Sequence, residues 1–308
     1  MKKLYIAILI SLIVPAALAH TAQAAISDYF VDTSWLSTRV DEVTVVDVRV
    51  GPKYLLGHID GALHIDKKEF LSFRQGVKSL IPTAGEARTL FERYGITPGS
   101  TVVVYAEHSN PYSARFAWTL RYHGHEKVYV LDGGYEKWSR EGLPTAILPT
   151  RAKKVDGHRI TSRRDIRAEA DQVLTRLSNS STVIWDTRRK AEYEGTEIRA
   201  DRGGHIPGAV HLHWLDLLEE QDGIKILKSR GEIEELLISY GITRDKAVIA
   251  HCQTGIRSAY ATLVLLALDY PDARNYDGSW IEWANNQEFP IGETREAAIK
   301  TGEAFILR

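Results

Sequence analysis

The chain has 308 residues, of which 44% are hydrophobic and 26% are charged, and its formal net charge at pH 7 is −1. Because basic and acidic residues nearly balance, this composition argues against bulk attraction to nucleic acid or to anionic lipid. The length and apolar content are sufficient for a full hydrophobic core, in one large domain or in two domains of ordinary size.

The first 24 residues have the pattern of an export signal. Lys2 and Lys3 precede an apolar run over 4–14 that is too short to span a bilayer, and small residues follow it. Two A-x-A sites compete for cleavage, after Ala19 and after Ala24, and we expect the second. The alternative, an uncleaved membrane anchor, is disfavoured because nothing extends the apolar run. We expect a periplasmic protein without stable membrane association, whose mature chain has 37 basic and 40 acidic residues and a net charge of −3.

From residue 43 onwards, short β-branched runs alternate with longer apolar segments that have the length of helices. Strands are predicted over 43–49, 101–106, 181–188 and 247–251, and helices over 113–124 and 258–270. This alternation predicts an α/β fold in which parallel sheets carry helices on both faces.

Four short motifs occur twice in the same order, which indicates a tandem duplication. The pairs are VDVR (46–49) with WDTR (185–188), GHIDGA (57–62) with GHIPGA (204–209), YGIT (94–97 and 240–243), and LDGGYEKW (131–138) with YDGSWIEW (276–283). The stretch 142–157 contains proline and lysine and has the composition of a linker. We predict a first domain over 25–146, a linker over 147–157 and a second domain over 158–308.

The only cysteine of the chain, Cys252, lies in a loop with the features of a reactive site. It directly follows the strand predicted to end at His251, so it lies at the carboxyl edge of the sheet, where ligands bind in open α/β folds. The loop CQTGIR (252–257) leads into a helix, so backbone N–H groups, the helix dipole and Arg257 all favour a thiolate. Gly255 supplies the backbone freedom that such a tight loop needs.

We therefore predict that Cys252 is the catalytic nucleophile. The residues predicted to bind the substrate are Gln253, Thr254, Gly255, Ile256 and Arg257. A lone thiol in an exported protein cannot form an internal disulfide, and the plain alternative is a buried cysteine beside an ordinary turn. That alternative does not explain why Gln, Thr and Arg crowd the loop.

Two other kinds of cysteine chemistry fit less well. His251 adjoins Cys252, but neighbouring strand residues point to opposite faces, so we expect a packed histidine and not a general base. Cysteine phosphatases place five residues between cysteine and arginine, whereas four separate Cys252 from Arg257 here and Ser258 occupies the arginine position.

With these motifs in place, the chain resembles a tandem-domain rhodanese, a thiosulfate sulfurtransferase, over essentially its whole mature length. The resemblance rests on the two Asp-x-Arg strand ends, both GHI-x-GA segments, the DGG and DGS segments followed by tryptophan, and the six-residue loop that Cys252 opens. It implies that each unit is a rhodanese-type α/β domain, that only the second is catalytic, and that the active-site cleft lies between them.

The resemblance also implies a two-step reaction through a Cys252 persulfide. The donor would be a small anion, thiosulfate, and the acceptor would be cyanide, a small thiol or a protein thiol. Asp186 and Arg188 are expected to support the loop as a structural ion pair. A gapless alignment on the DGG and DGS motifs places Glu107 opposite Cys252, so the first domain is expected to be non-catalytic.

One position departs from the mercaptopyruvate-type relatives. Where they carry an arginine that binds the substrate carboxylate, this chain has Glu192, which argues against 3-mercaptopyruvate as the donor. It leaves Arg257, with Arg202 as a further candidate, to attract the donor.

Other features are expected to be structural. His211 and His213 have H-x-H spacing, but no third ligand is evident, so we expect no metal, and no cofactor motif follows any strand. The functions left open are an active sulfurtransferase that uses thiosulfate or, as an alternative, 3-mercaptopyruvate, a persulfide carrier that serves an exported partner protein, and a purely structural module.

Overall fold

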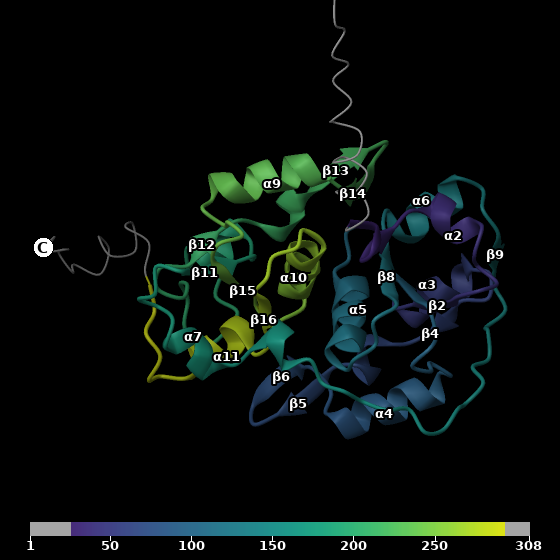
Figure 1. Cartoon of the computed structure of the whole chain (residues 1–308), viewed down its shortest axis with the longest axis horizontal. Helices are drawn as coiled ribbons and strands as arrows, with labels where there is room; N and C mark the ends of the chain where they lie inside the picture. Colours follow the sequence, from purple (N-terminus) through teal and green to yellow (C-terminus); the bar gives the residue numbers. More distant parts are fainter. Residues whose placement is uncertain (1–25, 293–308) are drawn as a thin grey trace, which may run out of the picture.

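The computed structural model describes residues 26–292, in which two α/β domains lie side by side (Figure 1). The predicted signal peptide lies outside the described residues. None of the described helices is long and apolar enough to cross a membrane.

Each domain is built on a five-stranded sheet in which all strands are parallel. The order in the first sheet is β1 (Phe30–Val31), β8 (Val128–Leu131), β7 (Val102–Tyr105), β2 (Thr44–Asp47) and β4 (Leu63–His64). The order in the second sheet is β10 (Arg167–Ala168), β16 (Ala273–Tyr276), β15 (Ala247–His251), β11 (Thr182–Asp186) and β12 (Val210–His211). The two orders correspond strand for strand, as the sequence repeat predicts.

Helices cover both faces of the first sheet because its strand residues alternate between two hydrophobic clusters. Val46, Val102 and Val104 belong to one cluster and Val45 and Val103 to the other. The helices of this domain are α2 (Thr33–Ser37), α3 (Gly51–Leu56), α4 (Ala84–Arg93), α5 (Tyr112–Tyr122) and α6 (Gly134–Arg140). Two short antiparallel ribbons complete the domain: β3 (His58–Ile59) with β9 (Thr145–Ala146), and β5 (Ser72–Arg74) with β6 (Val77–Leu80).

The second sheet is covered in the same way. Val248 and Ala250 face one cluster and Ile249 faces the other. The helices are α7 (Ala170–Leu174), α8 (Lys190–Tyr193), α9 (Arg230–Ser239), α10 (Arg257–Ala267) and α11 (Ser279–Asn285). The antiparallel ribbon is β13 (Leu218–Gln221) with β14 (Ile224–Leu227). The predicted fold class, two tandem α/β domains with parallel sheets, is therefore confirmed.

The two domains share one hydrophobic core. Helices α5 and α10 lie side by side at the centre of the molecule (Figure 1), and the buried residues around them form a single cluster that extends into both domains. Phe30 of β1 packs on Tyr260 of α10 with their ring centroids 5.4 Å apart. Each domain also sends a ribbon to the other: the Ile81 N–H after β6 donates to Asp277, and the Leu227 N–H of β14 donates to Asp132.

Between β9 and the 3-10 turn η2 (Arg164–Ile166) the chain has no regular element, where the sequence predicts the linker. This segment packs along the first domain. Val155 N–H donates to the Glu92 carbonyl, and the His158 ring bonds the Ile96 carbonyl. The boundaries of the domains and of the linker stay predictions.

Candidate active site

Cys252 is the first residue after β15, and the loop that it opens ends where α10 begins at Arg257. The loop is anchored to the DGS segment, because the Cys252 and Gln253 carbonyls accept the Trp280 and Ile281 N–H groups, each at 3.0 Å. The Cys252 N–H in turn donates to the Ser279 hydroxyl at 3.2 Å. The repeat motif around Trp280 thus holds the start of the loop in place.

Asp186 and Arg188 form a buried ion pair beside the loop. The Arg188 guanidinium bonds both Asp186 oxygens at 2.6–3.0 Å, donates to the Gly204 carbonyl at 2.7 Å and lies over the Trp280 ring. One arginine therefore connects the Asp-x-Arg, GHI-x-GA and DGS motifs.

The first domain contains the same arrangement. Arg49 bonds Asp47, donates to the Gly57 carbonyl at 2.7 Å and lies over Tyr135. Because the pair recurs where no thiol is present, its geometry is that of a structural support in both domains.

The Cys252 thiol is almost completely buried, with 1% of its surface exposed. Burial by itself raises the pKa of a thiol, but the Arg257 guanidinium and hydrogen bonds from Ser258 and Thr254 outweigh it, so the pKa of Cys252 lies below its ordinary value of 9.0. The site therefore favours the thiolate, which is the nucleophilic form.

The amino end of α10 contributes to this effect. Unlike α4 and α9, whose first N–H groups are satisfied by the capping boxes of Thr83 and Ser229, α10 has no side-chain cap. Its N-cap residue is Ile256, which has no hydrogen-bonding side chain. The first N–H groups of the helix, including that of Ser258, are therefore available to the sulfur.

Two of the residues predicted to bind the substrate, Gln253 and Gly255, fix the position and shape of the loop. Gln253 is buried and its side-chain amide donates to the Arg199 carbonyl at 2.9 Å, which ties the loop to the segment after α8. Gly255 has a φ of +73°, and a β-carbon there would lie 2.5 Å from the Asp277 carbonyl oxygen. Glycine is thus required at this point both by backbone conformation and by close packing.

Arg257 does not lie free in the site. Its guanidinium binds Glu192 of α8 with both nitrogens, at 2.6 and 2.8 Å. Burial opposes ionisation of Glu192, but Arg257 and Arg189 overcome it and lower the pKa of that carboxyl to about 2. Arg199 also contacts Glu192, at 3.2 Å, so the carboxylate lies among three arginines.

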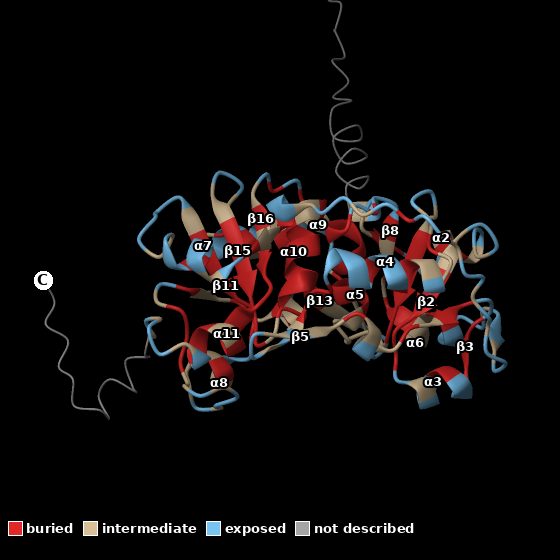
Figure 2. Cartoon of the chain, turned by 90° about the horizontal axis from the view of Figure 1, so that it is seen from below, coloured by how far each residue is buried: buried red, intermediate tan, exposed pale blue. Residues whose placement is uncertain are grey.

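The first domain has a counterpart of this ion pair with the charges exchanged. Lys53 of α3 corresponds in position to Glu192 of α8, and its ammonium binds Glu107 of the first-domain loop at 2.7 Å. Figure 2 shows α3 and α8 on the same side of the molecule, at opposite ends. A helix-to-loop ion pair is therefore common to both domains, while its polarity differs.

The predicted alignment of Glu107 with Cys252 is wrong by one residue. The register pairs Asp47 with Tyr105 in one sheet and Asp186 with His251 in the other, so the residue after Tyr105, which is Ala106, corresponds to Cys252. The backbone agrees, because the Ala106 carbonyl accepts the Tyr135 N–H as the Cys252 carbonyl accepts that of Trp280.

The reason for the misalignment is an extra loop residue. Five residues (107–111) separate Ala106 from the first residue of α5, whereas four (253–256) separate Cys252 from the first residue of α10. The gapless alignment was anchored beyond this insertion. The expectation that the first domain lacks a thiol and an arginine in its loop is unchanged.

Several other predicted residues have structural positions. His251 is fully buried, and burial lowers its pKa to about 4, so it is neutral and unsuited to act as a base at neutral pH. Arg202 donates to backbone carbonyls at the end of α11, including that of Ala284 at 2.8 Å, so its guanidinium caps this helix. The His211 ring bonds the Arg188 carbonyl, and the described residues contain no cluster suited to a metal.

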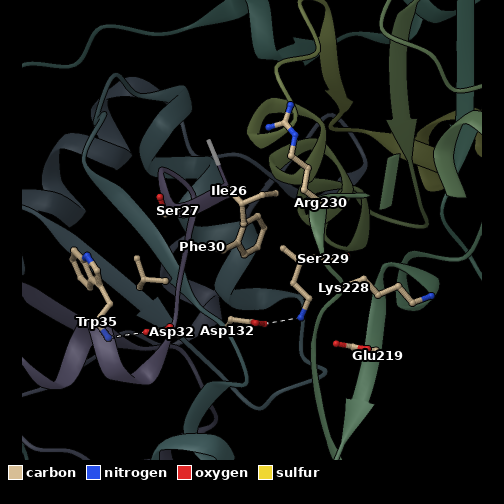
Figure 3. A pocket seen from close by; sticks show the side chains of 12 residues that line it. Ile26, Ser27, Phe30, Asp32, Trp35, Asp132, Glu219, Lys228, Ser229 and Arg230 are labelled. Carbon is tan, nitrogen blue, oxygen red and sulfur yellow. Dashed lines mark hydrogen bonds between the residues drawn. The ribbon is translucent and has the colours of Figure 1, made fainter. Parts of the chain in front are cut away.

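A separate cavity of about 380 Å³ lies between the first domain and the β14–α9 segment (Figure 3). Phe30, Trp35 and Asp132 line it from the first domain and Lys228 from the second. Burial raises the pKa of Asp132 to about 6. Cys252 does not line this cavity, so it is distinct from the candidate active site.

Comparison with known proteins agrees with this geometry. The model of the rhodanese-like domain matches twice, over residues 32–141 and 169–286. The chain belongs to the rhodanese family.

Relatives match most of the chain. It is 34% identical to a thiosulfate sulfurtransferase from Pseudomonas aeruginosa, with 81% of this chain and 91% of the relative covered. It is 33% identical to the sulfur carrier protein TtuD from Thermus thermophilus, with 87% and 98% covered. The anaerobic ergothioneine biosynthesis enzyme from Chlorobium limicola has the same fold, with a TM-score of 0.79 at 24% identity over 87% of this chain and 71% of that chain.

Together, the duplicated rhodanese domain and these relatives support sulfur transfer of the rhodanese type as the activity of the chain. Sequence reasoning did not find Arg115, Arg189, Arg199 or Ser279, which also contact the loop or its ion pair. Of these four residues, only Ser279 belongs to a repeated motif, as the serine of the DGS segment, so the sequence repeat could have indicated it.

Proposed function

We propose that the protein is a thiosulfate sulfurtransferase in which Cys252 carries the transferred sulfur. The observation that supports this most strongly is a buried thiol whose pKa is lowered by Arg257 and by hydrogen bonds from Ser258 and Thr254, at the uncapped start of a helix. A purely structural cysteine has no need of these stabilising groups.

The reaction proceeds in two steps. The Cys252 thiolate attacks the outer sulfur of thiosulfate, the S–S bond of the donor breaks, and sulfite leaves with the bonding electron pair. The outer sulfur of the resulting persulfide is stabilised by the loop N–H groups. A nucleophilic acceptor then attacks that sulfur, takes it away and regenerates the thiolate. With cyanide as the acceptor the product is thiocyanate.

Glu192 supports thiosulfate over 3-mercaptopyruvate. Its carboxylate is bound by arginines at the place where the mercaptopyruvate-type relatives have a substrate-binding arginine. An organic acid would have to bring a second carboxylate beside it, with a cost on the order of 1 kcal/mol or more in a partly buried site. The loop N–H groups remain available to a sulfonate.

The test is mass spectrometry of the intact protein after incubation with thiosulfate, followed by cyanide. We expect a mass increase of about one sulfur atom on Cys252, and its loss as thiocyanate appears. The control is Cys252→Ser, which retains the fold but cannot form a persulfide, so both the mass increase and the turnover should disappear. Residual turnover in this variant near the wild-type level would exclude Cys252 as the sulfur carrier.

A second candidate function is a persulfide carrier that delivers sulfur to a partner protein, which the relationship to a sulfur carrier protein favours. Both functions load Cys252, but only the enzyme turns over with a small acceptor. Stoichiometric loading without catalytic thiocyanate formation would therefore favour the carrier.

We also propose that residues 1–24 direct export to the periplasm. The basic start, short apolar run and A-x-A sites support this. Fractionation of bacteria that express the full chain or a form lacking residues 2–24 tests it, with amino-terminal sequencing of the mature protein. Cytoplasmic retention of the full chain would contradict export.

A further inference from the structure

We propose that Arg115 of the first domain is a positioning residue for the Cys252 loop of the second domain. Its role is to hold the Gly255 carbonyl away from the sulfur, so that the loop N–H groups face the thiolate and the persulfide. This inference rests on the proposed function and adds a contribution of the first domain to the catalytic site.

Arg115 lies on α5 and its side chain is completely buried. One terminal nitrogen donates to the Gly255 carbonyl at 3.1 Å. The other donates to the Asp277 carboxylate at 2.7 Å and to the Ser79 carbonyl at 2.8 Å. The guanidinium therefore connects the catalytic loop, the end of β16 and the β5–β6 ribbon.

The orientation of the Gly255 carbonyl determines the orientation of the Ile256 N–H, which belongs to the same peptide group. In a trans peptide the carbonyl and the following N–H point in opposite directions. The Gly255 carbonyl faces outward, to Arg115 and to the Asn275 side-chain amide at 3.0 Å, so the Ile256 N–H faces the inner side of the loop. If this peptide rotated, a carbonyl dipole would replace an N–H beside the anionic sulfur.

The guanidinium is itself held in one orientation. Asp277 has no exposed surface, and its other oxygen accepts the Ile81 N–H at 3.0 Å and the Arg167 Nε–H at 3.3 Å. Because Asp277 is itself held in place, the Arg115 guanidinium has little freedom to move. It can therefore fix the position of the Gly255 carbonyl.

The loop of the first domain has no corresponding arginine, although the aspartate that would bind it is present. Asp132 corresponds to Asp277 and accepts the Leu227 N–H, as Asp277 accepts that of Ile81. The residue on α10 that corresponds to Arg115 is Tyr260, which packs on Trp214 with their ring centroids 5.3 Å apart. An arginine thus occupies this position only where the opposite loop carries the thiol.

The test uses the full chain with Arg115→Lys and Arg115→Met. Lysine can keep an ion pair with Asp277 but has a single nitrogen for three acceptors, and methionine removes all three hydrogen bonds. The pH dependence of Cys252 alkylation by iodoacetamide is measured together with kcat and KM for thiosulfate. We expect the pKa of Cys252 to rise by about one unit, which is roughly tenfold less thiolate below that pKa. We also expect kcat to fall at least about tenfold with a smaller change in KM, because Arg115 contacts the loop and not the donor.

The matched control is Arg121→Met. Arg121 is also a buried arginine of α5, and it donates to the Val128 carbonyl within the first domain. We expect this variant to lose stability without a change in the pKa of Cys252. A wild-type alkylation profile and kcat in folded Arg115→Lys would overturn the positioning role, whether or not Arg115→Met folds. Failure of the wild-type protein to form a persulfide would instead overturn the proposed function, and the alkylation profile would still test Arg115.

Discussion

At the scale of single residues, the ion pair between Glu192 and Arg257 controls the charge beside the thiol. Arg257 lowers the pKa of Cys252, and Glu192 partly neutralises Arg257. A donor anion that approaches Arg257 would therefore meet a carboxylate that already binds the same guanidinium. The sequence predicts separate effects of these two residues on the donor, whereas the structure joins them in one ion pair.

We predict that Glu192→Gln lowers the KM for thiosulfate roughly fivefold, because removing one buried negative charge is worth about 1 kcal/mol to a nearby anion. Mercaptopyruvate should gain at least as much, since its carboxylate would no longer meet Glu192. Arg257→Met should have the opposite effect, with a higher KM and a higher pKa of Cys252.

The measurement is kcat/KM for both donors in the wild type and the two variants. Glu197→Gln is the control, because Glu197 pairs with Arg189 at 2.5 Å and is one-third exposed. An unchanged KM in Glu192→Gln would mean that this carboxylate lies outside the path of the donor.

At the scale of the elements, the two loops at the carboxyl ends of β7 and β15 explain why we expect only the second domain to be catalytic. The first-domain loop has one more residue, begins with Ala106 and contains Pro111, which has no N–H to donate. Its helix starts with Tyr112 where α10 starts with Arg257. A thiol alone would therefore lack the stabilising groups.

We predict that the double variant Cys252→Ser/Ala106→Cys has less than about 1% of wild-type turnover, since the new thiol would lack the arginine that lowers the pKa of Cys252, and Pro111 in its loop has no N–H to donate. Thiocyanate formation and the alkylation rate of the new cysteine are the measurements. Cys252→Ser alone is the reference. Turnover close to that of the wild type would show that the loop contributes little beyond the thiol.

The buried Asp–Arg pairs join three motifs in each domain, so they should matter for stability in both. We predict that Asp47→Asn and Asp186→Asn each lower the free energy of unfolding by about 3–5 kcal/mol, the usual cost of breaking a buried ion pair. Chemical denaturation measures this change.

The two substitutions should differ in activity. Asp186→Asn loosens the support of the Cys252 loop and should also reduce turnover of the protein that remains folded, whereas Asp47→Asn should not. Equal effects on turnover would contradict this distinction.

At the scale of the whole molecule, the domains are joined by a common core and by a buried ion pair. Arg115 and Asp277 belong to different domains and neither has exposed surface. The hydrophobic cluster around α5 and α10 also contains residues of both domains. Separating the domains would expose apolar surface and leave two buried charges without partners.

We therefore predict a single cooperative unfolding transition for the chain without residues 1–24. Calorimetry should give one peak, and tryptophan fluorescence and far-UV circular dichroism should have the same midpoint. Two resolved transitions would show that the domains unfold separately, so that the interface contributes less to stability than the core of each domain.

The tandem repeat, the α/β class and the position of Cys252 at the end of a strand could all be predicted from the sequence. These depend on local patterns: alternation of strand and helix lengths, repeated motifs, and the rule that ligands bind at the carboxyl edge of such sheets. The predicted strand 247–251 coincides with β15, and the predicted helix 258–270 overlaps α10.

The contacts that distant residues make with the loop and with Arg257 could be seen only in the folded chain. The contact of Arg115 with Gly255 joins residues 140 positions apart, and that of Glu192 with Arg257 joins residues 65 positions apart, so no local pattern predicts them.

The identification of Ala106, and not Glu107, as the counterpart of Cys252 needed the strand register, because an alignment without gaps cannot place an extra residue inside a loop. The sequence predicts Arg202 as a further cation of the site. In the folded chain the end of α11 lies at its guanidinium, and Arg202 caps that helix. The kind of chemistry follows from short-range sequence patterns, whereas these contacts depend on packing between residues that are far apart in the chain.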